Sequence, residues 1–292
     1  MNFSMKFVKW LARRDWIRFG IRKRIVNWWC SSRNPDVSFE VDFLGSVYRG
    51  NLRDYIDRCV YFYGAYEKVS LILLRDLAST VEQSVFVGVG ANGGQHSLWM
   101  ARYCSPVYVF EPWAPMREHL IEKVRLNQFK HVSVFPVGLG DCNAEMPFYS
   151  PPDSDAGIGS FIDTYHAWNR NSGESLPIRA GDGFFAEHAI APDIIKLDVE
   201  GFEAKVLAGL QQMLQQYKPA VLLEFSSTTR AQFGSLQGLL DMFPYPVEIR
   251  KIVPLSGLNY CLKEFSFDKV VIYLLGRLAD EFQINQAQVG QP

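Results

Sequence analysis

The spacing of apolar residues over the middle and end of the chain predicts an α/β fold. Short β-branched and aromatic runs alternate there with stretches of helical periodicity, as in a largely parallel sheet with helices on both faces. The predicted strands are Val85–Val89, Val107–Glu111, His131–Val137, Asp193–Asp198 and Ala220–Phe225. The helices expected after them are Gln95–Tyr103, Ala114–Leu126, Glu200–Gln216 and a further one that ends at Phe243.

Two strand-like runs, Val247–Ile252 and Lys269–Leu275, come late in the chain without a helix between them. Consecutive strands that lack a crossover helix pair antiparallel, so we expect these two at one edge of the sheet. The main domain is therefore placed at residues 85–280, and residues 281–292 are expected to form a tail.

A hairpin and helices are predicted ahead of this domain, in residues 36–84. Apolar and polar residues alternate over Asp36–Gly50 on either side of a turn at Leu44–Ser46, which is typical of a β-hairpin. Leu52–Thr80 has helical periodicity that is interrupted near Gly64. Much later, residues 141–190 are rich in Gly, Pro, Ser and Asp, and a stretch of this length predicts a cover over the substrate.

Residues 1–35 form the one strongly biased segment. They contain nine Lys or Arg residues, the single acid Asp15 and four tryptophans. Six apolar residues fall at helical spacing and could share one helix face: Phe3, Phe7, Trp10, Ile17, Ile21 and Trp28. Two interpretations stay open: a terminal helix that packs its aromatic residues on the core, or a basic amphipathic helix on an anionic membrane surface. RNA binding is a third, which nothing further along the chain supports.

The candidate binding chemistry begins at the turn that follows the first predicted strand. Gly88, Gly90, Gly93 and Gly94 interrupt the sequence between that strand and the next helix. A strand, a glycine turn and a helix in this order bring bare backbone amides to a phosphate or a nucleotide. The next predicted strand ends at Glu111, 21 residues after Gly90, where a carboxylate would bind the hydroxyls of a ribose. Capping of the following helix is the alternative role of Glu111.

Two further acids, Asp198 and Glu224, also stand at the ends of predicted parallel strands. Ligands of open α/β sheets bind at this edge, so Glu111, Asp198 and Glu224 are expected to face one crevice. Asp198 is also suited to cap the helix that follows it. Glu224 is suited to a catalytic role or to an ion pair with Lys196, because a buried unpaired carboxylate costs several kcal/mol.

Composition narrows the class of protein. The chain has 292 residues, 48% of them hydrophobic and 21% charged, which is ordinary for one globular α/β domain with extensions, and its net charge of −1 gives no sign of nucleic-acid binding. Its five cysteines show no pairing or zinc motif, no apolar run is long enough for a membrane span, and the N-terminus lacks a signal-peptide pattern. We therefore expect a cytoplasmic protein, with peripheral contact to the inner membrane face if residues 1–35 bind lipid, and no metal site.

Five segments together resemble the FkbM-type S-adenosylmethionine-dependent methyltransferases, over about residues 61–225. They are VFVGVGANGGQHSL from Val85, VYVFEP from Val107, GLGD from Gly138, DIIKLDVEGFEAKVLAGL from Asp193 and VLLEF from Val221. The resemblance implies a class I methyltransferase fold, with a seven-stranded, mostly parallel sheet whose last strand is reversed. It also implies S-adenosyl-L-methionine as the cofactor and O-methylation of a hydroxyl on a sugar, glycan or related small molecule.

The resemblance also assigns residues to the cofactor. The residues implied are Glu67, Gly88, Gly90, Ala91, Asn92, Gly94, Glu111, Leu139, Asp141 and Asp198. One position departs from the family, because Gly88 stands where an acid is usual. We expect Glu67 to supply the missing charge. If no residue does so, the chain is a weakened, scaffold-like member of the family.

Methyl transfer to a hydroxyl needs a group that takes the proton, in a site that aligns the reactants and excludes water. The candidates are Asp198, Glu224 and His166, the last of which lies in the predicted cover. The basic, aromatic N-terminus points to a lipid-linked form of the acceptor. A nicotinamide-dependent oxidoreductase is the alternative enzyme class, since it shares the glycine turn and the ribose acid. The sequence gives no indication of the oligomeric state.

Overall fold

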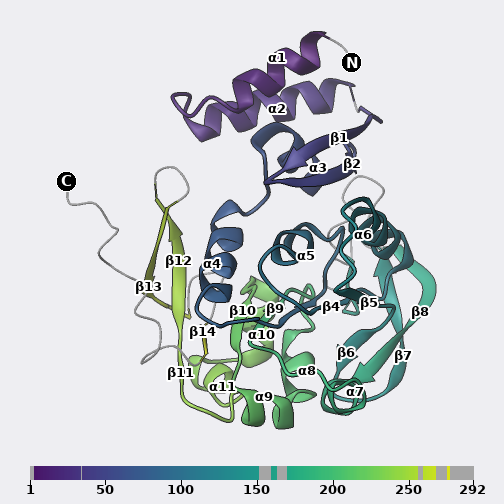
Figure 1. The fold of residues 1–292 in the computed structure, drawn as a ribbon, viewed down its shortest axis with the longest axis vertical. Coiled ribbons are helices and arrows are strands. Elements are labelled where there is room, and N and C mark those ends of the chain that lie inside the picture. The colour runs from purple at the N-terminus through teal and green to yellow at the C-terminus, as the bar shows by residue number, and fades with distance from the viewer. Residues whose placement is uncertain are drawn as a thin grey trace.

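The computed structural model describes residues 3–33, 35–150, 159–162, 170–255, 259–267 and 275–276. At its centre lies a five-stranded parallel sheet with the strand order β10-β9-β3-β4-β5 (Figure 1). The strands are β3 (Phe86–Val89), β4 (Val107–Phe110), β5 (Val132–Phe135), β9 (Ile194–Leu197) and β10 (Ala220–Leu223). All five lie within the predicted runs. The order along the sheet reverses beside β3, which is where open α/β sheets bind their ligands.

The predicted count of seven strands is wrong for the described residues. Late in the chain, β11 (Val247–Glu248) pairs antiparallel with β14 (Leu275–Gly276), and β12 (Arg250–Pro254) pairs with β13 (Tyr260–Glu264). The antiparallel pairing is thus confirmed, but as separate two-stranded sheets. β14 nevertheless lies against β10, the edge strand of the central sheet. Most of Lys269–Leu275 and all of residues 281–292 lie outside the described residues.

Helices cover both faces of the sheet, as predicted, and enclose two hydrophobic cores (Figure 1). One face carries α4 (Lys68–Ala78), α5 (Gln95–Met100) and α6 (Ala114–Leu126). The other carries α7 (Gly181–Glu187), α8 (Glu203–Ala208), α9 (Gln211–Tyr217), α10 (Ser227–Phe233) and α11 (Leu236–Leu240). Successive strand residues alternate between the faces, so Phe86 enters the first core and Val87 the second.

The helix predicted at Glu200–Gln216 is in fact two helices, α8 and α9, which are separated at Gly209. A Cβ atom on Gly209 would lie only 1.8 Å from the carbonyl oxygen of Gly140, so a close backbone approach requires glycine here. The carboxylate of Asp182 then accepts hydrogen bonds from the amides of Gln212 and Met213 at 2.9 Å, at the start of α9. This tertiary contact ends one helix and begins the next.

The predicted cover is largely a second sheet. Its strands, in the order β6-β8-β7, are β6 (Gly138–Gly140), β7 (Ala144–Ser150) and β8 (Arg170–Ala180). Phe148, Leu176 and Ile178 are buried in it. Pro147 and Pro177 interrupt the alternation of these strands, which is why the sequence pattern indicated a loop. Residues 151–158 and 163–169, which include His166, lie outside the described residues.

The N-terminal part consists of α1 (Phe3–Ala12) and α2 (Phe19–Arg33), the hairpin β1 (Ser38–Phe43) and β2 (Ser46–Asn51), and α3 (Tyr55–Tyr63). The hairpin is confirmed, and so is the helix break at Gly64, whose φ of +91° suits glycine. The helix pair α1–α2 lies at one end of the long axis of the molecule (Figure 1).

A buried lysine joins this N-terminal part to the glycine turn. Lys123 of α6 is 1% exposed, and its Nζ donates a hydrogen bond of 2.8 Å to the carbonyl of Gly93. The same Nζ lies 4.3 Å from the centre of the Tyr48 ring and 3.9 Å from Asp57 Oδ1. Asp57 also accepts a 2.8 Å hydrogen bond from the hydroxyl of Tyr48. The hairpin and α3 therefore help to hold the glycine turn in place through Lys123.

Candidate active site

A cavity of about 380 Å³ opens beyond the carboxyl ends of β3, β4, β9 and β10. This volume lies in the range of small-molecule sites. One part of its lining is the glycine turn with Glu111, and another is a group of carboxyl side chains. An aromatic wall comes from distant segments and consists of Tyr55, Tyr66, Trp113, Phe148 and Phe161. Among the described residues of the 141–190 stretch, Phe148, Gly159 and Phe161 reach this cavity.

The glycine turn follows β3 and lies in direct contact with the ends of β4 and β9. The amides of Gly90 and Ala91 both donate to the carbonyl of Phe110, at 3.1 and 3.3 Å. Gly90 has a φ of +76°, and a Cβ atom there would lie 1.8 Å from the carbonyl oxygen of Asp198. Asn92 also takes a positive φ, of 52°, which is a strained conformation for a residue with a side chain. Backbone of this kind provides the narrow cradle that a nucleoside or an amino-acid group needs.

Glu111 faces this turn. Its Oε2 accepts a hydrogen bond of 2.8 Å from the amide of Asn92, and its Oε1 accepts one of 3.0 Å from the amide of Trp113. Burial raises the pKa of Glu111 to about 7, although these amides and Arg117 favour the charged form. The carboxyl group therefore holds the turn in shape and lines the cavity at the same time.

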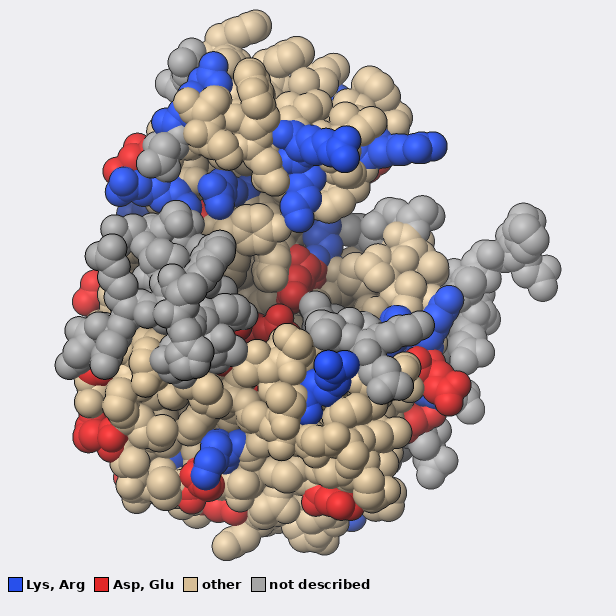
Figure 2. All heavy atoms as spheres, turned by 180° about the vertical axis from the view of Figure 1, so that it is seen from behind, with Lys and Arg blue, Asp and Glu red and all other residues tan. Residues whose placement is uncertain are grey.

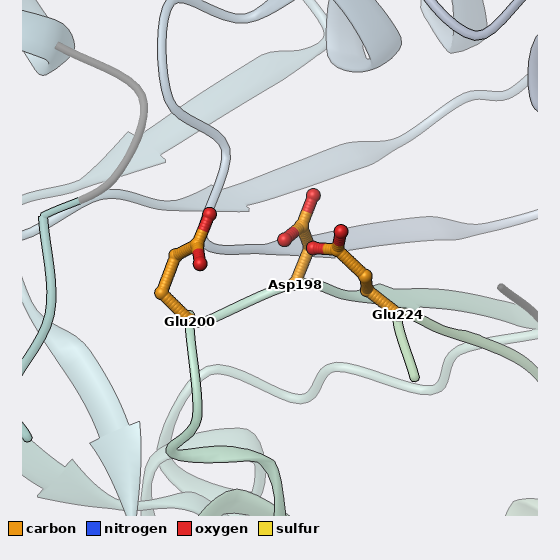
Figure 3. Close-up of side chains that lie close together, drawn as sticks. All are labelled: Asp198, Glu200 and Glu224. Atoms are coloured by element: carbon orange, nitrogen blue, oxygen red, sulfur yellow. The ribbon is translucent and has the colours of Figure 1, made fainter. Parts of the chain in front are cut away.

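Asp198, Glu200 and Glu224 bring one carboxylate oxygen each to within 4.8 Å of one another, and their side chains point to the same side (Figure 3). The Lys196 ammonium forms an ion pair with Asp198 and not with Glu224. Burial opposes ionisation, but Lys196 outweighs it and lowers the pKa of Asp198. The charge on Asp198 and the hydrogen bond between the two carboxyls raise the pKa of Glu224. The two carboxyls therefore titrate as a pair, in which Asp198 is favoured as the ionised member and Glu224 as the protonated one.

Glu203 explains the shape of the loop that carries two of these acids. Its Oε1 accepts hydrogen bonds from the amides of Val199 and Gly201 at 3.1 and 3.2 Å, and its Oε2 accepts one of 3.1 Å from the Thr229 hydroxyl. Glu200 is held in the left-handed region, with a φ of 50°. Because α8 begins at Glu203, Asp198 does not cap it, and that interpretation is wrong.

Three predicted cofactor residues do not reach the lining of the cavity. Asp141 pairs at the surface with Lys205, at 2.7 Å. Gly88 lies within β3, where an added Cβ would meet the Ser97 hydroxyl at 3.3 Å. Glu67 has its Oε2 3.5 Å from Nε2 of His96, which itself lines the cavity. A direct contact of Glu67 with the cofactor is therefore not supported, and its charge acts on the site through Lys196.

Several residues that line the cavity were missed as site residues in the sequence. His96 is neutral, because burial and then the charge of Lys196 hold its pKa well below 6.5. The aromatic wall also escaped notice, since its members lie in five separate segments. Lys196 was expected only as an ion-pair partner of Glu224, and Glu200 only as a neighbour of Asp198 in the DVEG segment; both line the cavity.

The three carboxyl groups are the described side chains that could hold a metal ion. A divalent cation favours several ionised oxygen ligands. Here the Lys196 ammonium already neutralises Asp198, and Glu224 keeps a proton. The ammonium group beside Asp198 opposes a cation at this point by charge repulsion.

The sequence profile of the methyltransferase FkbM domain matches residues 89–262, more than half of the chain. The chain belongs to the FkbM methyltransferase family. The resemblance found in the sequence is thus confirmed, and S-adenosylmethionine is the cofactor of this methyltransferase. The alternative of a nicotinamide-dependent oxidoreductase is wrong. The cradle at Gly90 and the carboxyl group of Glu111 fit the nucleoside of that cofactor.

Solved structures that resemble this chain include the methyltransferase FkbM from Methylobacillus flagellatus, at 16% identity and a TM-score of 0.45. That match covers 66% of this chain and 43% of the other, so the chain spans less than half the length of that relative. TYW2 from M. jannaschii, in complex with AdoMet, is 11% identical with a TM-score of 0.41, over 82% of this chain and 84% of the other. No curated protein sequence matches the chain.

Proposed function

We propose that this methyltransferase acts on a hydroxyl of a sugar, glycan or related small molecule. The observation that carries the proposal is the group of three carboxyl side chains in the same cavity as the glycine turn. Carboxylates accept hydrogen bonds from hydroxyl groups, and the aromatic wall offers flat apolar surface to the face of a sugar ring. A nucleic-acid acceptor has less support, because an anionic backbone would be repelled by these acids.

The cofactor supplies an activated methyl group, and the chain's own residues hold the two substrates. The Gly90–Gly94 turn and Glu111 are proposed to bind the cofactor, with Ala91, Asn92 and Leu139 beside it. Asp198, which stays ionised beside Lys196, is proposed to accept a hydrogen bond from the acceptor hydroxyl and to orient its oxygen. The protonated carboxyl of Glu224 donates a hydrogen bond to Asp198 and keeps the pair in one arrangement.

The lowered pKa of Asp198 is compatible with its role as proton acceptor. A hydroxyl oxygen that has gained a methyl group becomes a strongly acidic oxonium, so even a weakly basic carboxylate can take its proton. His166 is a second candidate for this role. It lies outside the described residues and is retained as a proposal from the sequence.

Binding and transfer assays test the proposed function. S-adenosylhomocysteine is expected to raise the melting temperature, and NAD is not. Transfer is then measured with methyl-labelled S-adenosylmethionine on a panel of nucleotide sugars, oligosaccharides and polyprenyl-phosphate sugars, and a new methyl ether in the product is the expected result. Methylation of nitrogen or carbon acceptors, with none at hydroxyl groups, would overturn the proposal. Cofactor binding without any transfer would identify a scaffold.

The role of Glu111 predicts a pH-dependent affinity for the cofactor. Ribose hydroxyls donate to the ionised carboxyl, whose pKa in the free protein is about 7. The affinity for S-adenosylhomocysteine is therefore expected to rise about tenfold or more between about pH 5.5 and 7.5. Calorimetric titrations measure this slope. Glu111→Gln should flatten it, whereas Glu118→Gln, on the exposed side of α6, should leave it unchanged.

Glu111 also affects stability in the absence of ligand. The folded state holds the proton of Glu111 up to about pH 7, whereas the unfolded chain releases it near 4.5. The free energy of unfolding of the free protein should therefore fall as the pH rises between these values. As the pH falls, this effect makes the free protein more stable while it weakens cofactor binding. A general loss of folding at low pH would instead lower stability and affinity together.

A further inference from the structure

Large apolar side chains are exposed on the helix pair α1–α2 and on the turn between the two helices, to an extent found nowhere else among the described residues. Phe3 is 83% exposed, Trp16 77% and Trp28 67%. Phe7, Trp10, Phe19 and Ile21 are also about half exposed or more. Elsewhere in the described chain, no large apolar residue is more than 42% exposed. An exposed apolar group of this kind marks a site of interaction.

These aromatic residues are not left over from an incomplete core. The helix pair packs on the rest of the molecule through different residues: Met5, Val8, Ala12, Val26, Trp29 and Cys30. The interpretation that the aromatic stripe packs on the core is therefore wrong. Phe3, Phe7 and Trp10 are spaced so that they share one side of α1, and the rings of Phe7 and Trp10 stack at 6.1 Å.

Basic residues accompany the aromatic ones. Residues 1–35 hold nine Lys or Arg and one acid, a net charge of +8, so the rest of this chain of net charge −1 carries −9. In the space-filling view, Lys and Arg side chains gather over the upper, N-terminal part, above a hollow with acidic side chains within it (Figure 2). An anionic surface would attract the helix pair and repel the remainder, so charge alone would orient the molecule.

We propose that the helix pair α1–α2, residues 3–33, docks on an anionic phospholipid bilayer. No helix among the described residues is long and apolar enough to span a membrane. Helices of 10 and 15 residues with exposed Trp and Phe beside Lys and Arg suit a position in the interface between lipid headgroups and acyl chains. The inference does not depend on the identity of the methyl acceptor.

Flotation of the full chain with vesicles tests the aromatic contribution. The wild type should float with vesicles of phosphatidylcholine and phosphatidylglycerol in equal parts, and far less with phosphatidylcholine alone. Trp16→Ser combined with Trp28→Ser should weaken this binding about tenfold or more. Leu236→Ser, an exposed apolar position on α11, is the matched control and should bind as the wild type does.

A second pair of variants tests the charge. Lys6→Glu with Lys23→Glu should abolish binding to anionic vesicles, whereas Lys130→Glu with Lys263→Glu, exposed lysines outside the helix pair, should reduce it only slightly. Wild-type binding should also weaken between about 0.1 and 1 M salt, over which the Debye length falls from about 10 to 3 Å. The melting temperature should be the same in all variants, because the substituted side chains are exposed. The affinity for S-adenosylhomocysteine should also be unchanged, because none of these residues lines the cavity.

Two results would overturn the proposal. One is flotation of the double tryptophan variant at the wild-type level. The other is a wild type that ignores anionic vesicles and forms a dimer which the tryptophan substitutions dissociate, because the exposed face would then cover a second copy of the chain. Sedimentation velocity on the same variants measures this second outcome. Both results leave the proposed methyl transfer untouched.

Discussion

Replacing Gly90 with alanine is expected to abolish cofactor binding and to lower the free energy of unfolding by about 3 kcal/mol or more. The added Cβ would lie 1.8 Å from the carbonyl oxygen of Asp198 and 3.0 Å from the Val199 side chain. The first of these is a backbone atom at the end of β9 and cannot move alone. The φ of +76° adds strain for any residue with a side chain. The ends of β3 and β9 must then separate, and the cradle is lost.

Gly183→Ala is the matched control for this substitution. Gly183 lies in α7, where an added Cβ would meet nothing within 4 Å, so alanine should leave stability unchanged or increase it. Denaturant unfolding and calorimetric titration with S-adenosylhomocysteine measure the two effects. A folded Gly90→Ala protein with wild-type affinity would show that the cofactor does not use this turn.

Substituting Asp198 with asparagine is expected to lower kcat/KM for methyl transfer by about 10²- to 10⁴-fold. Asparagine keeps the shape of the side chain but cannot accept a proton. The acceptor is the one identified in the transfer screen, and initial rates of labelled-methyl incorporation are the measurement. Asp141→Asn is the control, because Asp141 pairs with Lys205 outside the cavity and should leave the rate unchanged.

The coupling between the two carboxyls predicts that this variant remains folded. The charge on Asp198 is the largest cause of the raised pKa of Glu224. Without that charge, Glu224 should ionise and neutralise Lys196, so no buried ammonium is left unpaired. We therefore expect a small change in melting temperature beside a large loss of rate. If the Asp198→Asn rate equals that of the wild type and His166→Ala abolishes transfer, the proton acceptor is His166.

The sequence by itself determined the order and place of the central strands, because each is a short apolar run that ends at a glycine, an acid or a turn. It also determined which residues stand at the ligand-binding edge. Glu111, Asp198 and Glu224 all line the cavity, since parallel strands bring their carboxyl ends to one side of a sheet. Local pattern and sheet geometry suffice for such predictions.

Only the tertiary structure decided the partners of these residues. It paired Lys196 with Asp198, divided a helix at Gly209 and turned the predicted cover into a sheet. It also left the N-terminal aromatic stripe exposed while a second stripe packed on the core. In each case two local arrangements were compatible with the same spacing of residues. The choice between them depended on contacts with atoms that are distant in the chain, which periodicity along the sequence does not encode.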